Sequence, residues 1–109
     1  MAAGLMGNAV LAAAANTTVY TVPATVQYAE VDISVLNPTA SDAQIEVAIA
    51  KADSPTPAEY IEKGVIAFKS GGVVTRVGVL MGPGEKVVVK STAADTVVRV
   101  GGREFTSAV

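Results

Sequence analysis

The chain has 109 residues, half of them hydrophobic, and its eight basic and ten acidic side chains give a net charge of −2. It contains no Cys and no His, which excludes disulfides and thiolate nucleophiles and removes the commonest metal ligand and general base. The charges form no basic cluster, so neither nucleic acid nor an anionic membrane is an expected partner. We expect one domain without a catalytic site, a metal or a cofactor.

Residues 1–15 carry no charge and consist almost entirely of Ala, Gly, Leu, Met and Val. The stretch is too short and too rich in Ala for a transmembrane helix. It lacks the basic start of a secretory signal peptide, although residues 12–15 resemble a cleavage site. A helical or extended arm and a disordered tail remain, and the apolar character favours an arm that packs on a partner. Its expected partner-binding anchors are Leu5, Met6, Val10 and Leu11.

From residue 16 onward, apolar residues follow a period of two, with turn residues every eight to twelve positions. The first run, residues 17–22, stops at Pro23, which cannot donate a ladder hydrogen bond. The second, residues 26–36, alternates apolar and polar side chains as a half-buried strand does. A turn over residues 37–42 leads to a third run, residues 45–49. The second and third runs are predicted to pair as an antiparallel hairpin with a shared apolar face.

Later segments continue this pattern. Residues 53–57 are a Pro-containing loop, and residues 58–62 start either a helical turn or a short strand. Further strands are expected over residues 65–68, 73–80, 85–91 and 96–100, with Phe105 as a final anchor. The run 73–80 is Val-rich on both faces, which predicts burial on both sides and an interface on one of them.

Seven or eight strands are therefore predicted, and no helical apolar repeat occurs beyond residue 15. This pattern indicates an all-β protein with an apolar N-terminal arm over residues 1–15 and a β-sandwich domain over residues 16–109. The sandwich is expected to be immunoglobulin-like or a jelly roll, because strand number alone fits both.

Two groups of side chains are candidates for a functional site: a pair of glutamates and the three tyrosines. Glu59 and Glu62 meet on one face if this segment is helical, and paired carboxylates do acid–base work or bind a hard cation. No second acid, base or pocket signal accompanies them, so we expect surface residues. Tyr20, Tyr28 and Tyr60 are too few for a sugar-stacking platform, and Tyr20 and Tyr60 are expected at the core or its rim.

Several short segments carry a resemblance. They are the apolar start, Asn-Thr-Thr-Val-Tyr-Thr-Val-Pro-Ala at 16–24, Leu-Asn-Pro at 36–38, Ala-Glu-Tyr-Ile-Glu at 58–62, and the turn and strand at 82–89. Together they resemble small structural proteins of tailed bacteriophages, especially cyanophages, over nearly the whole chain. The resemblance implies a non-enzymatic component of the phage particle.

The first hypothesis from this resemblance is a capsid decoration or cement protein on the particle surface. It would be a homo-oligomer, with a trimer favoured, that binds and stabilises the lattice of the major capsid protein or other virion proteins, and the arm would order on that lattice. The alternative is a tail-fibre or baseplate module that binds a host receptor or glycan through loops such as residues 53–57. A third hypothesis, a secreted β-sandwich, requires cleavage of the first fifteen residues.

Overall fold

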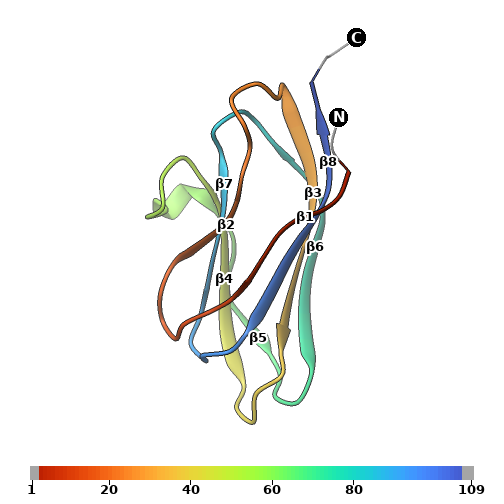
Figure 1. Ribbon diagram of the computed structural model, residues 1–109. Coiled ribbons are helices and arrows are strands. Elements are labelled where there is room, and N and C mark those ends of the chain that lie inside the picture. Colours follow the sequence, from red (N-terminus) through yellow and green to blue (C-terminus); the bar gives the residue numbers. More distant parts are fainter. Residues whose placement is uncertain (1–2, 107–109) are drawn as a thin grey trace.

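The computed structural model describes residues 3–106 and shows two four-stranded antiparallel sheets packed as a sandwich (Figure 1). Sheet I has the order β1-β8-β3-β6, and sheet II has the order β2-β7-β4-β5. The strands of sheet I are β1 (Ala3–Val10), β8 (Val97–Phe105), β3 (Tyr28–Asn37) and β6 (Gly72–Met81). Those of sheet II are β2 (Thr17–Thr21), β7 (Lys86–Ser91), β4 (Ala43–Ala50) and β5 (Tyr60–Ala67).

The core lies between the sheets and consists mainly of Val and Ile side chains. Val31, Ile33 and Val35 of β3 are at most 1% exposed and face Ile45 and Val47 of β4, which are equally buried. Successive residues of a strand point to opposite faces, so this alternation directs one set of side chains inward. Burial of each such side chain contributes about 1.5–3 kcal/mol.

The strands pair as in a long hairpin that has been rolled up. The pairs are β1 with β8, β2 with β7, β3 with β6 and β4 with β5, all antiparallel. Among the described strands, only β4 and β5 are both consecutive in the chain and neighbours in a sheet. Every other connection crosses from one sheet to the other.

The predicted hairpin between the second and third runs is therefore wrong. These runs became β3 and β4, which lie in different sheets. Their apolar faces do meet, but across the core instead of side by side. Period-two alternation determines which face of a strand is apolar, whereas it does not determine the neighbouring strand.

The N-terminal segment is also different from the expectation. Residues 3–10 form an edge strand of the sandwich, paired with β8, instead of an arm outside it. Met6 packs against the core, and Leu11 is 2% exposed within it. A stretch of apolar, uncharged residues is as suitable for a strand of the sandwich as for an arm outside it. Here the sandwich itself buries some of these side chains. Residues 1 and 2 of the expected arm lie outside the described residues.

The junction between β3 and β4 is organised by the fully buried Asn37. Its Nδ2 group donates hydrogen bonds to the carbonyl oxygens of Ser41 (2.7 Å) and Ala67 (2.9 Å). Its Oδ1 atom accepts from the Thr39 backbone N–H (3.1 Å) and hydroxyl (2.6 Å). One side chain therefore holds the predicted turn to the end of β5.

The undecided segment at residues 58–62 contains both expected conformations. A 3-10 turn, η1 (Pro57–Glu59), is followed directly by β5. Between residues 3 and 106 no helix is long and apolar enough to cross a membrane.

Candidate protein-binding face

The outer face of sheet I carries a row of aliphatic side chains across all four strands. Strand register places Val10 opposite Val97, Val97 opposite Leu36, and Leu36 opposite Val73. Val10 is 66% exposed, Leu36 37% and Val73 53%. We use the name aliphatic row for the four residues Val10, Val97, Leu36 and Val73, which lie at one end of the sheet.

Charged residues occupy the middle of the same face. The central strand β8 supplies Arg99 and Arg103, and the neighbouring central strand β3 supplies Asp32 and Glu30. Glu30 lies directly opposite Arg103 in the ladder. The face therefore combines a basic strand with an adjacent acidic strand, and these four charges sum to zero.

A shallow trough of about 460 Å³ lies between these charges. Arg99, Asp32, Ser34 and Leu5 contribute to its lining, and three glycines leave the space open. One of them, Gly102, has a φ of 139°, and a Cβ atom there would collide with the carbonyl oxygen of Glu30. A side chain at this position is thus disfavoured by backbone conformation and by space.

The far end of the face is aromatic and apolar. Tyr28 of β3 stacks on Phe105 of β8, with ring centroids 4.5 Å apart. Along the edge strand β6, Leu80 is 65% exposed and Val77 is 74% exposed. Beside Val77, the Asp32 carboxylate accepts a hydrogen bond of 2.9 Å from the Gly78 backbone N–H, at an irregularity in the ladder between β3 and β6. This bond connects the charged middle of the face with its edge.

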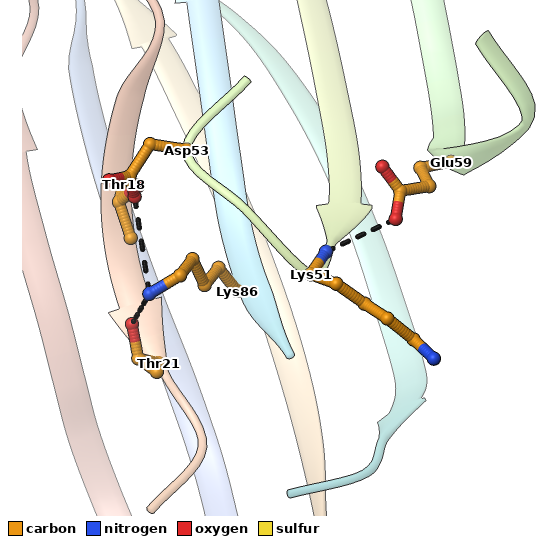
Figure 2. Close-up of polar contacts among 6 residues, drawn as sticks. All are labelled: Thr18, Thr21, Lys51, Asp53, Glu59 and Lys86. Atoms are coloured by element: carbon orange, nitrogen blue, oxygen red, sulfur yellow. Dashed lines mark hydrogen bonds and ion pairs between the residues drawn. The ribbon is translucent and has the colours of Figure 1, made fainter. Parts of the chain in front are cut away.

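The outer face of sheet II differs because the chain covers its apolar residues. Val88 and Ala48 belong to neighbouring strands of this face, yet they are at most 2% exposed. The loop after β4 crosses β7, the strand that carries Val88, and reaches β2, where the Asp53 carboxylate accepts a 2.5 Å hydrogen bond from the Thr18 hydroxyl (Figure 2). The Nζ atom of Lys86 lies 4.0 Å from an oxygen of the Asp53 carboxylate.

Glu59 closes the other end of this loop. Its carboxylate accepts hydrogen bonds from the backbone N–H groups of Thr56 (2.8 Å) and Lys51 (3.1 Å, Figure 2). The bond from Thr56 is the main reason that the pKa of Glu59 lies below its ordinary value, since it stabilises the charged form. The loop is therefore a fixed cover over sheet II.

The two faces are consequently unequal in exposed apolar surface. In the part of the chain that the structure describes, nine large hydrophobic side chains are exposed, and seven of them lie on strands of sheet I. The other two, Ile66 and Phe68, lie in β5 and directly after it. Within residues 3–106, no segment folds over the outer face of sheet I as the loop does over sheet II. Clustered apolar exposure of this kind marks an interaction surface.

The four anchors predicted from the sequence separate into two groups. Leu5, which is 54% exposed, and Val10 lie on the outer face of sheet I, whereas Met6 and Leu11 contribute to the core. Leu11 is therefore not available as a partner-binding anchor. The predicted anchors did not include Leu36. For residues 73–80 the sequence predicted burial on both sides and an interface on one; in the single chain one side is open, with Val73, Val77 and Leu80 exposed.

The other residues considered from the sequence have structural contacts. Glu59 ends η1 and Glu62 lies in β5, so they share no helical face, and Glu62 forms an ion pair of 3.0 Å with Arg76. The buried Tyr20 donates a hydrogen bond to Glu104, which links the two sheets. Tyr60 is half-buried at the rim, with the Lys63 ammonium 4.4 Å from its ring centre. Residues 3–106 contain no group of three or more acidic side chains arranged to hold a metal ion.

Comparisons with known proteins identify no relative. No protein-family model, no curated protein and no solved structure matches the chain significantly.

Proposed function

We propose that this chain is a non-enzymatic structural protein of a phage particle, a decoration or cement protein that binds and stabilises the capsid lattice. In this role the outer face of sheet I is the surface that becomes covered by protein in the assembled particle. The sequence resemblance described above supports a location on the particle, and the exposed apolar face supports a role in binding protein.

The open apolar face is the observation that carries the proposal. Leu36, Val73, Val77 and Leu80 are exposed together on two neighbouring strands. Apolar surface of this extent costs free energy in water, and burial against another protein recovers about 25 cal/mol per Å². Since sheet II covers its own apolar residues, the openness of sheet I is a specific property of one face.

The strand order supports the same role. Pairing of β1 with β8, β2 with β7, β3 with β6 and β4 with β5 supports a jelly roll, whose strands follow such a rolled-hairpin order. An immunoglobulin-like sandwich would instead pair its first two strands in one sheet. Jelly rolls recur in viral capsid proteins, and also in lectins, so the fold is compatible with the proposal without being specific for it.

Binding to particles tests the proposal. Leu36→Lys and Val73→Lys place charges within the aliphatic row, and we expect each to reduce occupancy on capsids from which the native protein has been removed. Glu46→Lys and Lys90→Glu, on the outer face of sheet II, are matched controls that should bind normally. Normal occupancy of both aliphatic-row variants would refute the assignment of the face.

A tail location is the alternative, and the trough is the feature that favours it. Arg99, Asp32 and Ser34 present polar groups above a floor of glycine backbone, as a site for sugar hydroxyls would. Electron cryo-microscopy of the particles separates the two roles. Density on the capsid lattice supports the decoration role, and density confined to the tail supports the fibre or baseplate role.

A further inference from the structure

The rows of side chains on the outer face of sheet I have an order that is complementary to itself. Rows run across β1, β8, β3 and β6, and the centre of the face lies between β8 and β3. Each row can therefore be read in the order β1, β8, β3, β6 or in the reverse order, and the two readings can be compared. The aliphatic row reads Val10, Val97, Leu36, Val73 in one direction and is equally apolar in the other.

From this order we propose that the outer face of sheet I binds a second copy of this chain, through a two-fold axis that runs along the strands between β3 and β8. The proposal rests on the proposed function, in which this face is covered by protein in the assembled particle, and it names that protein as a second copy. The dimer is then the unit that binds the capsid lattice, so a charge in the aliphatic row lowers occupancy by separating the two copies. Rotation by the two-fold axis places the two outer faces against each other. Each row keeps its position along the strand direction, and the order of the strands across the sheet is reversed. β8 of one copy then lies over β3 of the other.

The charges fit this arrangement. Arg103 of one copy lies over Glu30 of the second copy, and the symmetry repeats this pair on the other side of the axis. The basic residues of the face are all on β8, and the acidic residues are all on β3. Stacking β8 on β3 therefore brings opposite charges together, whereas stacking either strand on itself would bring like charges together.

The remaining rows are also compatible. Val97 lies over Leu36 of the second copy, and Val10 lies over Val73, so the aliphatic row is buried against itself. At the other end, Phe105 lies over Tyr28 of the second copy. In the middle, Asp32 lies over the position of Gly101, where the trough provides space for a side chain. Stacked sheets cross at about 30°, so these pairings hold best for the rows closest to the point where the two sheets cross.

The available area is sufficient for a specific dimer. Strands about 4.8 Å apart give a four-stranded face about 19 Å wide, and five rows about 6.8 Å apart extend about 27 Å. The flat footprint of the whole face is therefore about 500 Å² on each copy, or about 1,000 Å² in total, which reaches the lower range of specific interfaces. A two-fold dimer differs from the trimer that was favoured on the sequence alone.

Charge exchange tests this geometry. Glu30→Lys places Lys against Arg103 of the second copy, and Arg103→Glu places Glu against Glu30, each twice per dimer. We expect each variant alone to raise the dimer dissociation constant about a hundredfold or more, since like charges meet at both symmetric positions. In an equimolar mixture, both contacts become pairs of opposite charge, and heterodimers should form with near wild-type affinity.

The mixture separates an intermolecular effect from an intramolecular one. Glu30 and Arg103 also face each other within one chain, and each variant keeps its like-charged pair there in the mixture. Recovery on mixing can therefore come only from contacts between chains. Glu46→Lys and Lys90→Glu change another opposing pair, in sheet II, and should leave the dimer unchanged.

Sedimentation velocity from about 10 to 300 μM is the measurement, with circular dichroism to show that each variant folds. A wild-type monomer or trimer, a dimer that is insensitive to both charge variants, or no recovery on mixing would each overturn the proposal. Its failure is distinguishable from failure of the proposed function. A monomer that occupies capsids overturns only the dimer, and a dimer that does not occupy capsids overturns only the decoration role.

Discussion

Replacing Asn37 with Ala should release the junction between β3 and β4 and lower the stability of the whole sandwich. Asn37 is fully buried and forms four side-chain hydrogen bonds, two as a donor and two as an acceptor. Alanine removes all four and leaves the carbonyl oxygen of Ala67 inside the protein without this donor.

The expected loss is about 2–6 kcal/mol, because each of the four hydrogen bonds contributes about 0.5–1.5 kcal/mol net. A domain of this size typically has about 5–15 kcal/mol in total, so the variant should fold but melt early. At about 4 °C per kcal/mol, the midpoint of thermal unfolding should fall by about 8–24 °C.

Asn37→Asp gives the same site a pH dependence. The carboxylate keeps an acceptor for Thr39 but directs a second oxygen at the carbonyl groups of Ser41 and Ala67. Burial and this repulsion raise the pKa of the new carboxyl in the folded state above its ordinary value. The variant should therefore be least stable at neutral pH, and it should recover stability as the pH falls through the raised pKa.

Urea unfolding of both variants at pH 4 and pH 7 provides the measurement, with the exposed Asn8→Ala as a control expected to change stability by less than about 0.5 kcal/mol. A loss below about 1 kcal/mol for Asn37→Ala would show that the hydrogen bonds do not hold the junction. An identical pH dependence of Asn37→Asp and the wild type would refute the orientation assigned to the amide.

Two further outcomes follow from the core. Deleting β1 together with Leu11 should destabilise the sandwich by several kcal/mol in urea unfolding, because an edge strand and a core residue are lost; unchanged stability would restore the view of this segment as a separate arm. Tyr20→Phe should cost about 1.5–3 kcal/mol, since it removes the hydrogen bond to Glu104. The pKa of Tyr20 lies above its ordinary value, mainly because the side chain is buried and also because of this hydrogen bond. Wild-type stability should thus be complete below about pH 10 and fall above it, and a Phe variant with the same alkaline decline would contradict this cause.

The sequence predicted the strands better than their arrangement. Val31, Ile33 and Val35 alternate with polar residues, and that local pattern was enough to assign β3 and its buried face. The partner of β3 could not be found in the same way, because β6 and β8 are distant in sequence and any strand with an apolar face satisfies the pattern equally.

The candidate face was predicted only in part, for a related reason. Leu5 and Val10 were selected because the first fifteen residues carry no charge, and that criterion also selected Leu11, which is in the core. Leu36 and Val73 come from strands far apart in the chain, and only the ladder register places them opposite each other. A surface composed of one residue from each strand has no continuous signature in the sequence.

The rolled-hairpin pairing also determines the order in which this chain can fold. β4 and β5 pair across the loop of residues 51–59, whereas each pair further out joins segments more distant along the chain, until β1 meets β8. Closing long loops is slow, so we expect the transition state for folding to contain the β4–β5 hairpin and its immediate neighbours. During synthesis, β1 leaves the ribosome before the other strands of the sandwich and has no sheet partner until β8 has followed. The edge strand is therefore made first and folded last, and its lack of charge leaves it prone to aggregation throughout that interval.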